Sequence, residues 1–387
     1  MKIGFFTNTY LPINYGATVS VETFRKSLEK LGDEVFIFAP RHKDYEDEND
    51  SVFRYPSFMY NYKENYPIAI PFYPPIDNKI KELNLDIIHS HQPFSLGKKG
   101  LRQAKKNNIP IIFTHHTRYE DYAHYVPILP ESVLADLVKD EATRFANQCD
   151  LVIAPSKSIK EMIQSRGVKT RIEILPTGID FNKFQRGKRE NIRKKFGIKK
   201  NELLLLNVGR IEEEKNIMFM MDCIVETIKN NSRIKMMFAG KGSLKRELQE
   251  KARKNKIENK VIFPGLVDRE EIQDYFAAGD IYLQTSTSET QGISLYEAMA
   301  SSLPCLAVES TGAVDVVSNF ENGLLAKKNK KDFQEKLQKI LNDKKLREKI
   351  KKNALKTSGN YDFVKQAKRL KNLYLEVCKD KELKAGK

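Results

Sequence analysis

The chain has 387 residues, enough for two domains that each bury a core of their own. Its formal net charge is +16, and the excess lies wholly in the second half, because basic and acidic side chains balance in residues 1–180. The sequence contains no apolar run of about 18 residues, which excludes a membrane-spanning helix. It also lacks recognition-helix, zinc-finger and RNA-binding patterns, so we expect no nucleic-acid partner.

The basic excess falls mainly in residues 183–200 and in the lysine-rich part after Lys327. Such stretches either meet anionic lipid or nucleic acid, or are the solvated faces of lysine-rich helices. The amino terminus, Met1–Phe6, has the pattern of a buried strand and lacks the length and cleavage site of a signal peptide. We therefore expect a cytoplasmic protein.

Short apolar runs rich in Ile, Val and Phe alternate with helical patterns through the first 180 residues. This alternation predicts a parallel sheet whose strands are buried on both faces. The first helix, Thr18–Leu31, has an apolar stripe and stops at Gly32. The predicted strands are Ile3–Phe6, Val35–Ala39, Ile87–His89, Ile111–Thr114, Leu151–Ala154 and Ile172–Leu175.

The loop Thr9–Gly16 joins the first strand to the first helix. It contains no G-x-G-x-x-G fingerprint, so it is not a standard NAD site. Gly16 would let the backbone approach the phosphate or sugar of a ligand. It could equally be a plain turn glycine, and the sequence leaves both interpretations open.

Residues 55–76, YPSFMYNYKENYPIAIPFYPPI, are dense in aromatic residues and contain five prolines. Because proline interrupts regular elements, we expect these apolar side chains on irregular backbone. The segment then either packs on the domain as a flap or offers an aromatic face to a lipid acceptor or bilayer interface. Candidates for such a face are Tyr66, Phe72 and Tyr73.

Just downstream, residues 97–106 carry five positive charges and no negative ones on a predicted helix. Together with the aromatic segment they would form a docking surface for anionic membrane, to which each basic residue contributes about 1 kcal/mol. The alternative is the solvated face of an ordinary helix. The basic residues are Lys98, Lys99, Arg102, Lys105 and Lys106.

Four of the six histidines lie between His89 and His116, at or just after the ends of two predicted strands. The sequence places no acidic residue with them, so the ligands for a tetrahedral zinc site are incomplete and we expect no metal. Their spacing alone assigns them no other role.

The alternation breaks at residues 176–180 and then resumes, so we place a domain boundary after residue 180 and predict a second α/β domain over residues 181–360. A last helix, Phe363–Val377, has an apolar face too wide for a free tail. The predicted strands of the second domain are Leu203–Val208, Lys235–Ala239, Val261–Phe263, Ile281–Leu283 and Cys305–Val308.

Loops that follow strands of the second domain carry groups suited to a diphosphate. Arg210 and Lys215 supply two cations five residues apart, the arginine as a fork and the lysine as a point charge. Gly240 opens a glycine turn that leads into a helix. Each feature alone is more often a surface charge or an ordinary turn, but several strand-end loops together favour a nucleotide-sugar site.

The stretch 284–300, QTSTSETQGISLYEAMA, passes from a buried strand into a helix that begins near Gly292. Glu289 in the loop and Glu297 in the helix can point into one pocket at the carboxyl end of the strand and accept hydrogen bonds from sugar or ribose hydroxyls. The amides of Gly292, Ile293 and Ser294 lie at the helix start, where partial positive charge suits a phosphate. The alternative is an ordinary first turn with solvated glutamates.

The two glutamates in SETQGISLYEAMA resemble the paired-glutamate motif of retaining glycosyltransferases of family 4, and GRIEEEKNI resembles the same family. In the first half, THHTRYEDY resembles the segment with which that family places a histidine beside the transferred sugar. The alignment favours His116, with His115 as the fallback. Within the family, HSHQPFSLG and YEDYAHY resemble the 1,2-diacylglycerol glucosyltransferases.

The resemblance implies the GT-B fold, in which two Rossmann-like, doubly wound parallel-sheet domains face each other across a cleft and residues 361–387 return to the first domain. It implies transfer of a hexose, glucose from UDP-glucose, to a membrane lipid hydroxyl such as that of diacylglycerol. The configuration would be retained, and neither metal nor other cofactor would be required. The protein would then be peripheral on the inner face of the cell membrane, bound to its anionic surface.

By the same resemblance, Arg210 and Lys215 hold the diphosphate, Glu297 the ribose hydroxyls and Glu289 the hydroxyls of the transferred sugar, while His116 lines the reaction centre. The acceptor stays open, with phosphatidylinositol, a polyprenyl-linked glycan or a soluble glycan as alternatives. A non-catalytic nucleotide-sugar-binding protein would have the same cleft. The sequence does not determine the oligomeric state.

Overall fold

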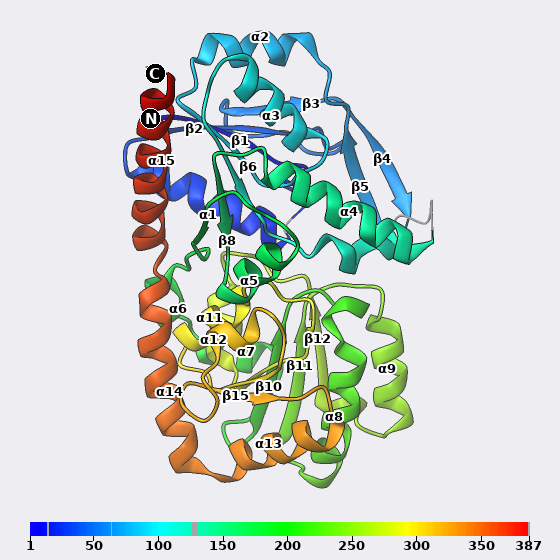
Figure 1. Cartoon of the computed structure of the whole chain (residues 1–387). Coiled ribbons are helices and arrows are strands. Elements are labelled where there is room, and N and C mark those ends of the chain that lie inside the picture. Colours follow the sequence, from blue (N-terminus) through cyan, green and yellow to red (C-terminus); the bar gives the residue numbers. More distant parts are fainter. Residues whose placement is uncertain (14, 63, 126–129, 386–387) are drawn as a thin grey trace. The chain divides into compact units, whose positions relative to one another are not determined.

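A computed structural model describes residues 1–13, 15–62, 64–125 and 130–385 of the chain (Figure 1). Contacts divide it into two compact units, the first made of residues 1–178 and 363–387 and the second of residues 179–362. Each unit is a parallel sheet with helices on both faces, which confirms the predicted α/β class. Within the described ranges, none of the helices combines the length and the apolar character needed to cross a membrane.

The first unit is built on a seven-stranded parallel sheet in the order β3-β2-β1-β6-β7-β8-β9. The strand order reverses between β1 and β6. The loops after these two strands therefore lie next to each other at the carboxyl edge of the sheet and lead to helices on opposite faces. The predicted strands are present, and β3 is an addition that an arginine in its centre had obscured. The strands are β1 (Lys2–Phe6), β2 (Glu34–Pro40), β3 (Val52–Tyr55), β6 (Ile87–Ser90), β7 (Ile111–Thr114), β8 (Leu151–Ala154) and β9 (Ile172–Ile174).

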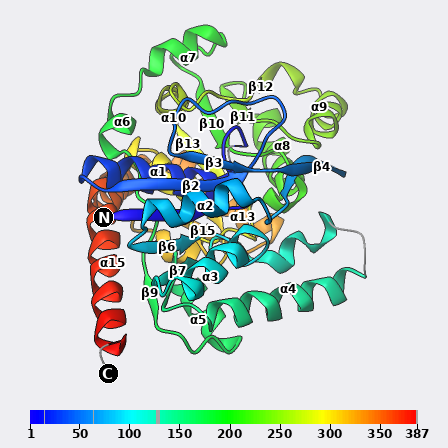
Figure 2. The ribbon, with the colours of Figure 1, turned by 90° about the horizontal axis from the view of Figure 1, so that it is seen from above.

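Helices cover both faces of this sheet because successive strand residues point to opposite sides. Helices α1 and α15 pack on the face that bears Phe5 and Ile87, whereas α2 to α5 pack on the face that bears Phe6 and Ile88. Helix α15 lies against α1 (Figure 2). The helices are α1 (Gly16–Lys30), α2 (Pro74–Leu83), α3 (Leu96–Lys106), α4 (Glu131–Ala146), α5 (Lys157–Ser165) and α15 (Phe363–Ala385), with a 3-10 helix, η1 (Tyr119–Tyr125).

The expectation of irregular backbone through residues 55–76 is wrong. Strands β4 (Ser57–Tyr62) and β5 (Glu64–Ala69) pair as an antiparallel hairpin. Pro67 is tolerated because both strands of a two-stranded sheet are edge strands, on which a missing N–H need not interrupt the ladder. Pro74 and Pro75 start α2, where proline fits the first turn.

The second unit has a six-stranded parallel sheet in the order β12-β11-β10-β13-β14-β15, which reverses between β10 and β13. All predicted strands are present, and only the three-residue β15 was missed because it is too short to show a pattern. The strands are β10 (Leu203–Val208), β11 (Ile234–Ala239), β12 (Val261–Gly265), β13 (Ile281–Gln284), β14 (Cys305–Val308) and β15 (Leu324–Ala326).

Two layers of helices enclose this sheet. Helices α6, α7, α10, α11 and α12 pack on one face, and α8, α9 and α13 pack on the other, while α14 contributes to both layers. The helices are α6 (Phe181–Gln185), α7 (Arg189–Lys195), α8 (Ile217–Asn230), α9 (Lys245–Lys254), α10 (Ile272–Ala278), α11 (Ile293–Ala300), α12 (Ala313–Val316), α13 (Lys330–Asn342) and α14 (Lys344–Ser358), with 3-10 turns η2 (Glu213–Lys215), η3 (Glu258–Lys260) and η4 (Gly359–Tyr361).

Candidate active site

In the second unit, the loops after β10 and β13 meet where the strand order reverses, the position at which open α/β sheets bind ligands. The hydroxyl of Thr285 donates to the carbonyl oxygen of Lys215 at 3.1 Å. The hydroxyls of Ser286 and Ser288 each donate to the carbonyl oxygen of Glu214 at 3.3 Å. The hydroxyl side chains of the loop after β13 therefore hold the loop after β10 beside it.

An ion pair joins these two loops. The Nζ atom of Lys215 lies 3.1 Å from Oε2 of Glu289, and the other carboxylate oxygen accepts the backbone N–H of Gly292 at 3.3 Å. Burial opposes ionisation of Glu289, but Lys215, that N–H and Arg210 outweigh it and hold the pKa of the carboxyl below its ordinary value of 4.5. Glu289 is therefore a carboxylate at neutral pH, held beside an ammonium group.

Helix α11 begins directly after Gly292, as predicted. Gly292 has a φ of 78°, in the left-handed region that favours glycine. Its N–H is already bonded to Glu289, so the expectation that it binds phosphate is corrected. Ile293 and Ser294 are the first two residues of the helix, so their backbone N–H groups have no acceptor within it. These two amides still suit an anion, as predicted from the sequence.

Glu297 is buried, with 3% of its surface exposed, so it is not a solvated glutamate on the surface of the helix. Helix α11 is short and apolar, so a carboxylate on it needs a charged partner, and Nη1 of Arg269 donates to it at 2.8 Å. Lys183 donates to the carbonyl oxygen of Arg269 at 2.7 Å, and burial together with Arg269 lowers the pKa of that lysine. Neither cation was predicted, because Lys183 lies in α6 and the position of Arg269, four residues after β12, does not by itself indicate a contact with Glu297.

The two remaining residues of this unit that were predicted to bind the nucleotide sugar lie in the loops after β10 and β11. Arg210 forms an ion pair with Glu214 in its own loop. Gly240 packs against the neighbouring loop, because a Cβ atom there would lie 1.8 Å from the carbonyl oxygen of Gly209. The structure therefore explains Gly240 by the close approach of two backbones, and the expected contact of Gly240 with a ligand has no support from this geometry.

Gly312, in the loop after β14, was missed. Its N–H donates to the carbonyl oxygen of Glu289 at 2.7 Å, and a Cβ atom there would lie 2.6 Å from the backbone nitrogen of Gln291. Gly312 thus holds the loop that carries Glu289. A glycine in the loop that follows an apolar strand at the same sheet edge was the available signal.

In the first unit, the loops after β1 and β6 also meet at a reversal of strand order. The backbone N–H of Asn8 donates to Oε1 of Gln92 at 2.7 Å, and the N–H of Leu96 donates to Oδ1 of Asn8 at 3.0 Å. Gly16 is the first residue of α1, and a Cβ atom on it would meet nothing within 4 Å. This position leaves room for a ligand and also suits a plain helix start.

His116 follows β7 and lies beside His91, with its Nε2 atom 2.9 Å from Nδ1 of His91. Desolvation lowers the pKa of His116 to about 3 and that of His115 to about 4, so both rings are neutral at physiological pH. His115 is buried and packs edge-on against Tyr119, whereas His116 is half-buried. Exposure therefore favours His116 over the fallback.

The aromatic membrane candidates separate into two groups. Phe72 and Tyr73, which lead into α2, are 72% and 37% exposed. Tyr66 instead points inward, where its hydroxyl bonds Thr9 and donates to the carbonyl oxygen of Asn8 at 3.1 Å. Tyr66 is therefore part of a packed flap, and its assignment to the membrane is corrected.

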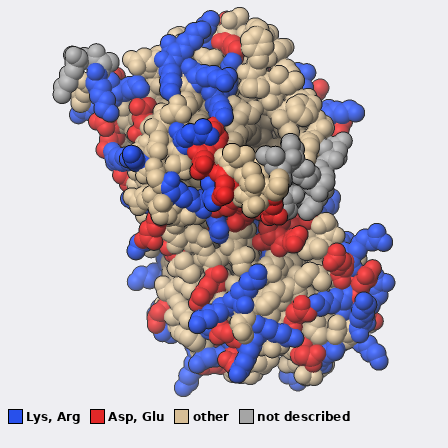
Figure 3. All heavy atoms as spheres, turned by 45° about the vertical axis from the view of Figure 1, so that its right-hand side comes forward, with Lys and Arg blue, Asp and Glu red and all other residues tan. Residues whose placement is uncertain are grey.

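The basic candidates on α3 separate in the same way. Lys99 is buried and pairs with Asp77 of α2 at 2.6 Å, so it ties two helices together and cannot face a membrane as expected. Lys98 pairs with Glu141 of α4 at 2.7 Å. Figure 3 shows Lys and Arg side chains gathered on part of the first unit, whereas on the second unit they alternate with Asp and Glu. The exposed basic residues of α3 are Arg102, Lys105 and Lys106.

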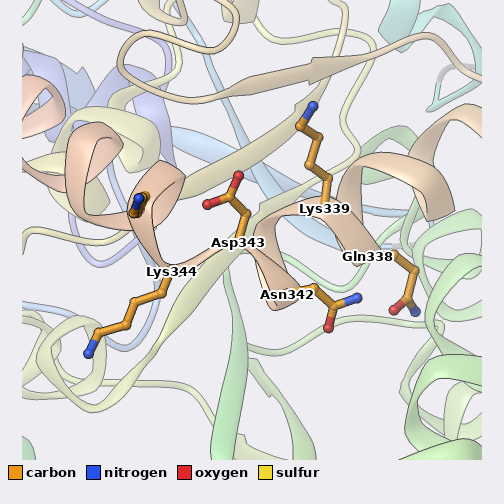
Figure 4. A pocket seen from close by; sticks show the side chains of 6 residues that line it. Gln338, Lys339, Asn342, Asp343 and Lys344 are labelled. Carbon is orange, nitrogen blue, oxygen red and sulfur yellow. The ribbon is translucent and has the colours of Figure 1, made fainter.

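A shallow depression lies at the turn between α13 and α14 (Figure 4). Helix α13 runs back from the carboxyl end of β15, so this turn is at the opposite sheet edge from Glu289 and Lys215. The side chains of Lys339, Asp343 and Lys344 point in different directions and do not converge. We therefore place no substrate there.

The two units match two related sequence families. Residues 15–183 match the family described as Glycosyltransferase Family 4, and residues 188–357 match the family described as Glycosyl transferases group 1. Alpha-monoglucosyldiacylglycerol synthase of Streptococcus pneumoniae is 36% identical, over 79% of this chain and 71% of that enzyme. The enzyme of the same name from Acholeplasma laidlawii is 30% identical over 100% of both chains.

Solved structures match the whole arrangement of elements. HepE of Anabaena in complex with UDP superposes with a TM-score of 0.79 at 18% identity, covering 97% of this chain and 100% of that one. Sucrose-phosphate synthase of Thermosynechococcus elongatus gives a TM-score of 0.80 at 17% identity, covering 97% and 98%. The predicted resemblance is confirmed, and the chain belongs to the family 4 glycosyltransferases and has the GT-B fold.

Proposed function

We propose that the protein transfers the glucosyl group of UDP-glucose to the free hydroxyl of diacylglycerol at a membrane surface, with retention of configuration. The observation that carries this proposal is the match, over the full length of both chains, to an enzyme named alpha-monoglucosyldiacylglycerol synthase. The geometry of the two units supplies independent support, which concerns the donor in the second unit and the acceptor in the first.

The donor half rests on the loops after β10 and β13. Breaking the bond between C1 of the sugar and the diphosphate oxygen leaves negative charge on the diphosphate, so fixed positive charge there lowers the barrier. An ammonium group has three N–H donors, so Lys215 can bind a phosphate oxygen while it stays bonded to Glu289. Arg210 and the amides at the start of α11 add further donors. Because these cations supply the charge, we propose that no metal is needed.

The sugar and ribose would be bound by the two glutamates. Glu289 is ionised and lies beside Lys215, so it can accept hydrogen bonds from hydroxyls of the transferred glucose close to the diphosphate site. Glu297, fixed by Arg269, would accept those of the ribose. HepE, which has been solved with UDP-glucose, supports a uridine nucleotide as the carrier.

Retention is supported by the names of the two relatives, which specify an alpha product, since the glucose of UDP-glucose is itself alpha-linked. In the proposed step the acceptor oxygen bonds to C1 on the face from which the diphosphate leaves. The C1–O bond to the diphosphate breaks, and the acceptor proton passes to a leaving phosphate oxygen. His116, neutral at physiological pH, would line this reaction centre as a hydrogen-bonding group.

The acceptor half rests on the first unit. Phe72 and Tyr73 are exposed just before α2, and an ion pair ties α2 to α3. The exposed side of α3 carries Arg102, Lys105 and Lys106. Apolar side chains for insertion beside positive charge are what a peripheral protein needs to bind an anionic bilayer. We therefore propose that this part of the first unit docks on the inner face of the cell membrane.

The test measures UDP release from UDP-glucose on vesicles that contain diacylglycerol, with and without phosphatidylglycerol. We expect release only with diacylglycerol, and faster release with the anionic lipid. Serine variants of exposed basic residues on α3 should lower vesicle binding and turnover together, most at low salt, whereas a matched control on the second unit should change neither. The test variant replaces Arg102, Lys105 and Lys106, and the control replaces Lys328, Lys330 and Lys331.

Two outcomes would contradict parts of the proposal. Full turnover on a soluble glycan with no effect of vesicles would refute the lipid acceptor and leave the glycosyltransferase. UDP-glucose binding without UDP release under any of these conditions would indicate a nucleotide-sugar-binding protein without catalysis.

A further inference from the structure

Three histidines of the first unit form a continuous row of contacting rings, which the proposed function leaves unexplained. His89 lies in β6 and His91 follows that strand, and their ring centroids are 4.3 Å apart with the planes at 24°. The rings of His91 and His116 are inclined at 21° with their centroids 5.1 Å apart, and they meet edge to edge through ring nitrogens 2.9 Å apart. We call these three residues the histidine column.

Hydrogen bonds anchor one end of the histidine column and join two of its members. At one end, Nδ1 of His89 lies 2.6 Å from the hydroxyl of Tyr374 in α15, and its Nε2 lies 2.7 Å from the hydroxyl of Thr114. At the other end, Nδ1 of His91 lies 2.9 Å from Nε2 of His116. His91 therefore links the ring of His116 to the anchored ring of His89, by a hydrogen bond on one side and by stacking on the other.

The contact between His91 and His116 also couples their tautomers. Burial lowers the pKa of His91 well below 6.5, and the ring of His116 is neutral as well. In a neutral pair one of the two facing nitrogens must carry the hydrogen and the other must accept it. If Nδ1 of His91 donates, His116 carries its own hydrogen on Nδ1; if it accepts, His116 carries it on Nε2.

Burial of His91 decides between the two arrangements. Its second nitrogen, Nε2, is buried and has no hydrogen-bond partner among the residues that the structure describes. A hydrogen placed there would be a buried donor without an acceptor, and orphaned N–H groups are rarer in proteins than unsatisfied acceptors. The favoured arrangement therefore has the hydrogen of His91 on Nδ1, from which it is donated to His116.

We propose that His91 is a positioning residue, which orients the ring of His116 and holds it in the tautomer with hydrogen on Nδ1, while Tyr374 anchors the column from α15. The proposal rests on the proposed function in one respect, that His116 lies beside the reacting sugar. It goes further by predicting that the reaction depends on His91, which contacts His116 but not the sugar.

The first test reads the tautomers directly, by NMR of the full chain with 15N-labelled histidine at neutral pH. In the wild type, the hydrogen of His116 should be on Nδ1 alone. His91→Phe keeps an aromatic ring but removes the nitrogen, so His116 should populate both tautomers. His91→Asn places an amide where Nδ1 lay and should restore one tautomer. An unchanged His116 signal in His91→Phe would overturn the proposal.

The second test uses turnover of UDP-glucose with diacylglycerol vesicles. His91→Phe should lower kcat by about ten- to a hundredfold, as misplacement of a group at a reaction centre does, with little change in the KM for UDP-glucose. His91→Asn should recover most of the loss. The control, His42→Asn, changes a half-exposed histidine outside the column and should leave kcat unaltered. An unchanged kcat in His91→Phe would contradict the positioning role.

The design separates failure of this proposal from failure of the proposed function. If wild-type protein transfers no glucose, the proposed function fails while the tautomer prediction can still be read. If His91→Phe does not fold, as shown by its thermal unfolding, His91→Gln replaces it, because its amide falls at the position of Nε2 and cannot reach His116. Restoration of His116 by asparagine but not by glutamine supports the proposal, and equal behaviour of the two refutes it.

Discussion

Replacing Lys215 by methionine removes the charge that joins the loops after β10 and β13 and keeps most of the length of the side chain. At 3.1 Å, two unit charges attract by about 5 kcal/mol if the effective dielectric constant is about 20. Part of this is offset by desolvation, and Glu289 keeps the N–H of Gly292 and the charge of Arg210. We therefore expect unfolding to become easier by about 2 kcal/mol.

The same substitution should weaken UDP binding. Loss of one charge-assisted hydrogen bond to phosphate costs about 1.5–3 kcal/mol, or about 10- to 150-fold in Kd. A matched control is Lys336→Met, since Lys336 lies 2.8 Å from Asp332 with similar exposure but in α13, away from the donor loops. Calorimetry with UDP should show weaker binding for Lys215→Met only. Equal UDP affinity in both variants would refute the role of Lys215.

Lys215→Met should also change how the stability of the protein depends on pH. The folded-state pKa of Glu289 lies below its ordinary value of 4.5, so the stability it contributes is present above that pH and is lost as the pH falls through the folded pKa. Without Lys215 the folded pKa rises, and denaturant midpoints should fall less steeply than in the wild type as the pH is lowered below 4.5. An unchanged acid slope would show that Lys215 does not hold the carboxylate.

Three further substitutions test contacts that position the site. Gly312→Ala should weaken UDP binding, because its Cβ would lie 2.6 Å from a backbone nitrogen in the Glu289 loop; unchanged calorimetry would contradict this. Tyr374→Phe should lower the free energy of unfolding by about 1 kcal/mol through loss of the bond to His89, as measured by denaturant titration, and an unaltered midpoint would count against that bond. Glu297→Gln should weaken UDP binding and cost about 1 kcal/mol of stability, because Arg269 loses an ionic partner; a variant that binds UDP as tightly as the wild type would remove Glu297 from the donor site.

The fold could be predicted where an element is buried on both faces. Apolar runs such as Leu203–Val208 show this directly, because a central parallel strand has no solvent face. The hairpin β4–β5 was missed because the prolines of this segment suggested irregular backbone, whereas an edge strand tolerates the one proline that lies in it, Pro67. The three residues of β15 are recognisable as a strand only through their partners in β14.

The candidate site could be predicted where residues follow strands, since parallel strands bring their ends to one edge. This placed Lys215 and Glu289 together correctly. Arg269 was missed because it reaches Glu297 only through tertiary packing. Lys99 was assigned to a membrane surface because charge pattern does not reveal burial, and the structure pairs it with Asp77 inside the first unit.

The most direct test of the central claim is the structure of the lipid product made from UDP-glucose and diacylglycerol vesicles. Wild-type protein should yield one glucolipid, whose anomeric proton coupling in NMR identifies an alpha linkage to the glycerol hydroxyl. Glu289→Gln should make far less of the same product. A beta-linked product would contradict retention, and the absence of any glucolipid, with UDP-glucose intact, would contradict the proposed reaction itself.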